Sequence, residues 1–207
     1  MQITEIRPKP HQKGIYQIFV EGKFWAEVLD ESIVKFNLRS GKDFSEDFLA
    51  QVFTLSRRPL ALHLALNHLE RWAKTKRQIK QYLFEKGFSV DDVDFVVWRL
   101  EELNILNDRK FAEYYIATHQ IKGKRAIKYD LKIKGLEDAI INDCLETIGN
   151  QDDVILHLAK KFARAKRADP KLKEKLFRHL VGKGFGFEET NAAINKILKG
   201  ENDESWD

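Results

Sequence analysis

The sequence predicts a mainly α-helical protein in which three similar three-helix units follow a small α+β module. Three observations support this prediction: a Lys-Gly-apolar motif occurs three times at nearly constant spacing, an alternating hairpin pattern precedes the first copy, and charged residues are abundant. Hydrophobic residues fill 43% of the 207 positions and charged residues 33%, which is typical of a helical protein with a large surface and not of a disordered chain.

The repeated motif marks the ends of helices. An amphipathic run that ends in Lys-Gly and an apolar residue occurs three times, at residues 79–88, 127–136 and 176–185. The glycines of these runs lie 48 and 49 residues apart, at Gly87, Gly135 and Gly184. Glycine just after a helix favours a left-handed cap, and the acidic residues that follow favour the start of another helix. We therefore expect three-helix repeats over residues 56–106, 107–150 and 151–198.

The first two repeats show further helix signals. The apolar stripe of Leu62, Leu66 and Leu69 predicts a helix from Pro59 to Trp72, separate from a short helix over residues 45–55. Thr75 and Gln78 have the spacing of a capping box. In the second repeat a helix is expected to begin at Asn107 or Asp108 and to bury Phe111 in the core.

Residues 1–55 have a different pattern and are predicted to form the α+β module. Two alternating segments, residues 15–20 and 23–28, flank Glu21-Gly22, which predicts a β-hairpin with a two-residue loop. Residues 3–7 are a candidate third strand, and residues 30–38 a short helix. At the other end, residues 199–207 carry a net charge of −3, and we expect an acidic, disordered tail there.

The sequence shows no persuasive catalytic or metal-binding pattern. The six histidines lack metal-ligand spacing. The single cysteine, Cys144, lies on a predicted apolar helix face, and we expect it to be a thiol buried in the core. The segment 182–186 has Gly-Lys-Gly-Phe-Gly but no dinucleotide-binding spacing. No apolar run is long enough to span a membrane, and no signal peptide is apparent. We therefore expect a cytoplasmic protein that is not an enzyme and that needs no metal or cofactor.

Basic residues recur on the predicted helices and are the best candidates for partner binding. Residues 151–198 alone carry a net charge of +5. Cations spaced by three or four residues share one helix face, so successive repeats could present a basic ridge to phosphates or to an acidic protein. The alternative is an ordinary solvated face. The candidate residues are Lys76, Lys80, Lys124, Arg125, Lys128, Lys132, Lys160, Arg164 and Arg167.

The second repeat resembles the central repeat of the RecX family of bacterial RecA regulators. The similarity lies in Asp108, Phe111 and Ala112, then in the segment Gly123-Lys124-Arg125-Ala126-Ile127, and then in Lys134-Gly135-Leu136. In the first repeat, Thr75 and Gln78 stand where the family has Ser and Glu, and both replacements keep the capping chemistry. In the third repeat, Gly182 stands where the family has a cation, which weakens the expectation of a contact there.

The resemblance implies three tandem repeats in an elongated, curved array without enzymatic activity. It also implies a protein that binds the RecA–single-stranded DNA filament and inhibits its recombinase, ATPase and coprotease activities in DNA repair, recombination and the SOS response. Separately, we expect a monomer. Single-stranded or duplex DNA would be a weaker ligand, and no membrane partner is expected. The alternative is a protein that binds DNA or RNA directly, with its three-helix units acting as helix-turn-helix modules.

Overall fold

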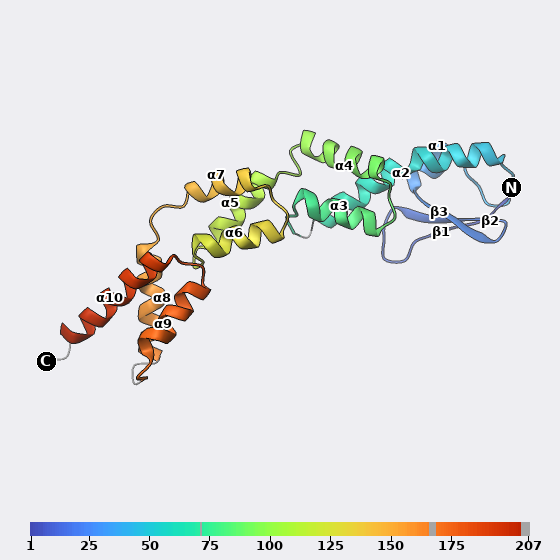
Figure 1. Cartoon of the computed structure of the whole chain (residues 1–207). Helices are drawn as coiled ribbons and strands as arrows, with labels where there is room; N and C mark the ends of the chain where they lie inside the picture. Colours follow the sequence, from blue (N-terminus) through green and yellow to red (C-terminus); the bar gives the residue numbers. More distant parts are fainter. Residues whose placement is uncertain (71, 166–168, 204–207) are drawn as a thin grey trace. The chain divides into compact units, whose positions relative to one another are not determined.

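The computed structural model describes residues 1–70, 72–165 and 169–203. It divides into two compact units, of which the first is Met1–Leu106 and the second begins at Asn107. Figure 1 labels the elements of the first unit: β1 (Ile3–Pro8), β2 (Ile15–Val20), β3 (Lys23–Leu29), α1 (Asp30–Lys35), α2 (Glu46–Leu69), α3 (Lys76–Glu85) and α4 (Val90–Glu102). The second unit holds α5 (Asp108–Thr118), α6 (Lys124–Ile133), α7 (Asp138–Glu146), α8 (Asp152–Ala165), α9 (Leu172–Gly182) and α10 (Phe187–Asp203). The predicted fold class is thereby confirmed.

The three strands form one antiparallel sheet in the order β1-β2-β3. The hairpin loop is the predicted Glu21-Gly22, and both residues have positive φ angles, 50° and 76°, as a tight two-residue turn requires. The fully buried side chains of Ile3, Ile18 and Val28 form a core with Val52 of α2. The predicted hairpin and third strand are confirmed.

Helix α2 corrects the prediction of two helices at this point in the chain. It runs without interruption over Glu46–Leu69, with Ser45 as its N-cap and Pro59 in its interior. Proline removes one backbone donor, but this cost is outweighed because both halves of α2 bury apolar residues. The first half packs on the sheet through Leu49, and the second half packs on α3 and α4 through Leu64.

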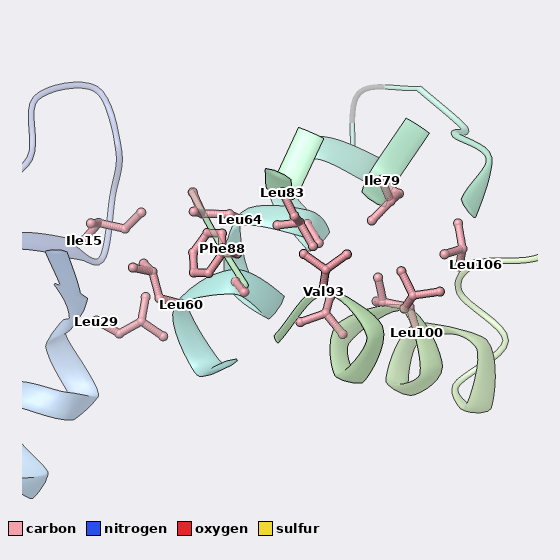
Figure 2. Close-up of a cluster of buried hydrophobic side chains, with 14 residues drawn as sticks. Ile15, Leu29, Leu60, Leu64, Ile79, Leu83, Phe88, Val93, Leu100 and Leu106 are labelled. Carbon is pink, nitrogen blue, oxygen red and sulfur yellow. The ribbon is translucent and has the colours of Figure 1, made fainter. Parts of the chain in front are cut away.

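The first repeat therefore shares its core with the N-terminal module. Figure 2 shows Leu83 of α3 facing Val93 of α4, while Ile15 and Leu29 reach the same cluster from the sheet, next to Leu60. The predicted boundary between residues 55 and 56 falls inside α2. One continuous cluster of buried side chains links the sheet to the helices of the first repeat.

The three predicted left-handed helix ends are present. Gly87, Gly135 and Gly184 have φ angles of 79°, 87° and 89°. The capping box of Thr75 and Gln78 forms, with both backbone N–H groups bonded to the opposite side chain. The predicted disordered tail is wrong in part, because α10 continues through Asp203. The buried Ile194 and Ile197 anchor this helix, and residues 204–207 lie outside the described part of the chain.

The second unit contains two cores, one for each of its repeats. Ile127, Leu131 and Ile141 are fully or almost fully buried among α5, α6 and α7. Leu176, Leu180 and Phe185 are buried in the same way among α8, α9 and α10. Phe111 is only half-buried at the edge of the first of these cores, contrary to the prediction, because α5 turns Ala112 to the centre instead.

Two glycines join the second repeat to the third. The N–H groups of Gly123 and Arg125, at the start of α6, donate to the carbonyl oxygens of Lys183 and Gly184 over 2.9 and 3.2 Å. A Cβ atom on Gly123 would collide with the backbone of Gly184, and a Cβ on Gly184 would collide with Ala126. Glycine is therefore required at both positions, and the start of α6 has a fixed place against the α9–α10 turn.

Candidate partner-binding surface

Helix α6 is the element that presents the predicted basic residues of the second repeat. Ile127 and Leu131 face the core, which leaves Lys124 and Arg125 exposed in the first turn. Neither cation forms an ion pair with any of the described residues. Cations at a helix N-terminus oppose the helix dipole, so these two charges do not serve the stability of α6.

The other two predicted cations of α6 have partners on α7. The ammonium of Lys128 donates to the side-chain oxygen of Asn142 over 2.8 Å, and that of Lys132 forms a 2.8 Å ion pair with Asp138. Lys132 is thus compensated, whereas Lys128 is held by a neutral amide. The uncompensated cations of this helix are Lys124, Arg125 and Lys128.

In the first repeat the predicted cations are compensated. Lys76 of α3 forms an ion pair with Glu101, and Lys80 forms one with Asp94 over 2.7 Å. Both carboxylates come from α4, which packs along α3. The first repeat therefore contributes much less net positive charge at these positions than the sequence pattern suggested.

In the third repeat, α8 carries the predicted residues Lys160 and Arg164 on its exposed side. Together with His157 and Lys161 they line a surface hollow of about 560 Å³. Lys160, Lys161 and Arg164 form no ion pair within the part of the chain that the structure describes. Lys161 was not predicted, although its place one residue after Lys160 was visible in the sequence. Arg167 lies outside the described residues.

The residues of the predicted family motif have structural positions. Asp108 and Ala112 are buried, with exposed fractions of 5% and 0%. The ring centre of Phe111 lies 5.9 Å from the ammonium nitrogen of Lys134. Asp108 and Ala112 thus lie inside the repeat, and Phe111 packs on the edge of its core. The motif therefore supports the packing of α5, which lies against α7.

A polar cluster that the sequence analysis missed fixes the segment before α6. Lys122 donates to the Asp130 carboxylate over 2.6 Å, and the Tyr115 hydroxyl donates to the same oxygen over 2.9 Å. Burial alone would raise the pKa of the Asp130 carboxyl, but these two hydrogen bonds lower it below its ordinary value. The cluster ties the loop at Lys122 to the middle of α6.

Exposed aromatic rings beside the cations were also missed. Tyr129 of α6 is 65% exposed, one turn after Arg125. The guanidinium of Arg125 lies 5.2 Å from the ring centre of Phe187, which is itself half-exposed at the start of α10. The four-residue spacing of Arg125 and Tyr129 in the sequence predicts that the basic and the aromatic side chain lie on the same helix face.

A metal cluster, a reactive thiol and a membrane-spanning helix are not apparent in the described residues. No group of three or more His, Cys, Asp or Glu side chains there is arranged to hold a metal ion. Cys144 is buried, and burial raises the pKa of its thiol, which disfavours the nucleophilic thiolate. Among the same residues, none of the helices combines the length and apolar character needed to cross a membrane.

Comparison with known proteins gives consistent matches over all three repeats. Family models of the first, second and third three-helix domains of RecX match residues 61–100, 107–145 and 151–194. The regulatory protein RecX of Leuconostoc mesenteroides is 30% identical over 198 residues, which cover 92% of this chain and 74% of that protein. The regulatory protein RecX of Clostridium perfringens is 28% identical over 207 residues, covering 97% of this chain and 98% of that protein.

Solved structures agree with these matches. A crystal structure of regulatory protein RecX superposes with a TM-score of 0.67 at 24% identity, covering 94% of this chain and 98% of that one. The structure of RecX from Lactobacillus salivarius gives a TM-score of 0.64 at 26% identity, covering 68% of this chain and 96% of that one. The three matched domains and the full-length relatives together show that this chain belongs to the RecX family of regulatory proteins.

Proposed function

We propose that this protein binds the RecA–single-stranded DNA filament and inhibits its recombinase, ATPase and coprotease activities. Its membership of a family of regulatory proteins supports a binding role instead of a catalytic one. The observation that carries the proposal is the cluster of uncompensated cations on α6, because both components of such a filament, the nucleic acid and acidic protein surfaces, are negatively charged.

The geometry of α6 supports this use of its charges. The hydrogen bonds from Gly123 and Arg125 to the third repeat, and the Lys122–Asp130 bond, hold the helix from both sides. Cations on a fixed helix lose little conformational entropy when they meet a partner. The cations of α8 add a second basic surface in the same unit, so several weak contacts can act together on a repetitive partner.

The proposal is tested by neutralising matched lysines in two repeats. Lys124→Gln with Lys128→Gln should raise the concentration needed for half-inhibition of RecA single-strand-dependent ATPase about tenfold, which corresponds to about 1.4 kcal/mol. The matched control, Lys76→Gln with Lys80→Gln, should change it less than about twofold, because those charges are already compensated. Circular dichroism checks that both variants are folded.

Two results would contradict the proposal. The first is a parent protein that leaves RecA ATPase and strand exchange unchanged at equimolar concentration. The second is a folded Lys124→Gln, Lys128→Gln variant that inhibits as well as the parent. That result would assign the α6 cations to an ordinary solvated face.

A further inference from the structure

The two outer strands of the sheet differ in how their free edges are covered. At β1, the Ile3 N–H donates to the Lys42 carbonyl oxygen over 3.1 Å, and the Gly41 N–H donates to the Ile3 carbonyl oxygen over 2.7 Å. Pro8, the last residue of β1, has no N–H group to offer. Among the described residues, no backbone hydrogen bond joins Lys23–Val28 of β3 to any segment other than β2. The edge of β3 is therefore open, whereas the edge of β1 is closed at both of its ends.

The register of the sheet shows which backbone groups of β3 point outward. In an antiparallel sheet, successive residues of a strand turn their N–H and C=O groups to opposite edges. The Ile15 carbonyl oxygen accepts from the N–H of Lys9, which follows β1, over 2.8 Å. Tyr16, the next residue of β2, therefore turns toward β3, and its partner Val28 turns back toward it. Glu27, the neighbour of Val28, consequently points its N–H and C=O groups away from the sheet.

A groove of about 260 Å³ follows this open edge. Five consecutive residues of β3, 24–28, line it, although their side chains alternate between the two faces of the sheet. The groove therefore runs along the backbone of the strand. Its other wall is α2, whose lining residues share one helix face because they are three or four positions apart: Phe53, Arg57, Leu60 and Leu64. A strand edge beside a helix is the arrangement in which PDZ domains take up an extended peptide.

The side chains of the groove define the chemistry of its occupant. Phe24 and Phe53 are 56% and 40% exposed, and the ring centres of Trp25 and Phe53 lie 6.2 Å apart, so the groove offers apolar surface. Lys86 also lines the groove, is exposed, and forms no ion pair with any of the described residues. An extended segment turns alternate side chains to one side. A segment that alternates apolar and acidic residues would cover the rings and neutralise Lys86.

We propose that the open edge of β3 binds an extended segment of a protein partner, in which apolar and acidic residues alternate, as a fourth strand of the sheet. The Glu27 N–H and C=O groups form the two backbone hydrogen bonds at the centre of this pairing. Apolar side chains of the added strand pack on Trp25 and Phe53, and an acidic side chain meets Lys86. This interaction uses the first unit of the chain and requires neither the cations of α6 nor RecA.

The test measures binding of a short labelled peptide of alternating valine and glutamate to the full chain by fluorescence anisotropy. We expect the parent to bind this peptide, and to bind a peptide of alternating valine and lysine at least about tenfold more weakly. Two further peptides are N-methylated, one on its valine nitrogens and the other on its glutamate nitrogens. Because the N–H groups of alternate residues point to opposite edges of a strand, only one of the two should lose binding.

Substitution of Glu27 tests the edge directly. Glu27→Pro removes the outward N–H but leaves the hydrogen bonds of β3 to β2, which come from the neighbouring residues. It should weaken binding at least about tenfold. The matched control Glu27→Ala keeps the N–H and should bind as tightly as the parent or more tightly, since it also removes the carboxylate that pairs with Lys9. Circular dichroism checks the folding of both, and if Glu27→Pro does not fold, the two N-methylated peptides decide the question on the parent.

Three outcomes overturn the proposal. The first is a parent that does not bind the valine–glutamate peptide, or that binds the valine–lysine peptide or both N-methylated peptides equally well. The second is a folded Glu27→Pro variant that binds as Glu27→Ala does. The third is a parent that is a dimer in solution and that becomes a monomer on Glu27→Pro, which would assign the edge to a second copy of this chain. In each case the inhibition of RecA ATPase is measured separately and stands or falls by itself.

Discussion

Helices α3 and α6 occupy the same position in their repeats, and the two differ almost entirely on the outside. Ile79 and Leu83 of α3 are fully buried, and so are their equivalents Ile127 and Leu131 of α6, to within 1%. Both helices end at a glycine with positive φ. On the surface, Asp94 and Glu101, the acids that pair with the lysines of α3, are replaced 48 residues later by Asn142 and Gly149.

The comparison shows which residue positions of a repeat are constrained by the stability of the fold. A buried leucine contributes several kcal/mol, so the core positions are tightly constrained. An exposed ion pair contributes only about 0–1 kcal/mol, so replacing Asp94 by an amide at the equivalent Asn142 costs the fold little. Charge on the outer face is therefore free to differ between repeats and can be used to choose where a partner binds.

The largest expected effect tests whether the two cores are equivalent. Leu83→Ala and Leu131→Ala should each lower the free energy of unfolding by about 3 kcal/mol, because each removes a fully buried side chain and leaves a cavity. Urea denaturation followed by circular dichroism measures both. A loss below about 1 kcal/mol for Leu131→Ala alone would mean that the second repeat is packed more loosely than the first.

The glycine caps should have a smaller and matched effect. Gly87→Val and Gly135→Val should each cost about 1–2 kcal/mol, because a β-branched residue resists the φ angles of 79° and 87° found there. Nothing lies within 4 Å of the Cβ position at Gly87, so the cost there comes from the backbone alone. An unchanged melting temperature in either variant would contradict this account. Substituting Gly149 with Ala serves as a control because that glycine has no positive φ angle.

Local signals were sufficient to predict most of the fold. The Lys-Gly-apolar motifs and the Glu21-Gly22 loop are fixed by backbone geometry within a few residues, and the structure confirms them. The continuity of α2 depended instead on contacts with the sheet and with α3 and α4, which no local pattern around Pro59 reveals. The curvature of the repeat array and the exact domain boundaries stay predictions.

The candidate surface was predicted less completely, for a physical reason. The sequence shows that Lys80 and Lys128 are basic, but their hydrogen-bond partners, Asp94 and Asn142, lie 14 residues away on another helix. Net charge at a surface depends on those tertiary neighbours. Aligning the repeats at a spacing of 48 would have revealed the change from Asp94 to Asn142. The contact of Gly123 with Gly184 had no such signal, because it joins two different repeats.

The smallest expected effect concerns the response of each repeat to acid. Tyr82 of α3 stacks on His68 at 4.1 Å, and its equivalent in α6 is Asp130. Burial raises the pKa of Tyr82, so that side chain stays neutral at acidic pH. The Asp130 carboxyl has a lowered pKa because Lys122 and Tyr115 donate hydrogen bonds that outweigh its burial. Of these two equivalent side chains, only Asp130 of the second repeat titrates at acidic pH.

The lowered pKa fixes the direction of the pH dependence. An Asp carboxyl in an unfolded chain has a pKa of about 3.9. The contribution of Asp130 to the free energy of unfolding is therefore fully present above that pH and is lost as the pH falls through the lower pKa of the folded state. Asp130→Asn should lower the melting temperature slightly at pH 7 and should lower it less at pH 3, because below a pH of about 3.9 part of the stabilisation by the carboxylate is already lost. Tyr82→Phe, the control in the first repeat, should shift the melting temperature equally at both pH values. An Asp130→Asn shift that is the same at pH 7 and pH 3 would show that the carboxylate does not stabilise the segment before α6, and that Gly123 is held in place by its contact with Gly184 instead.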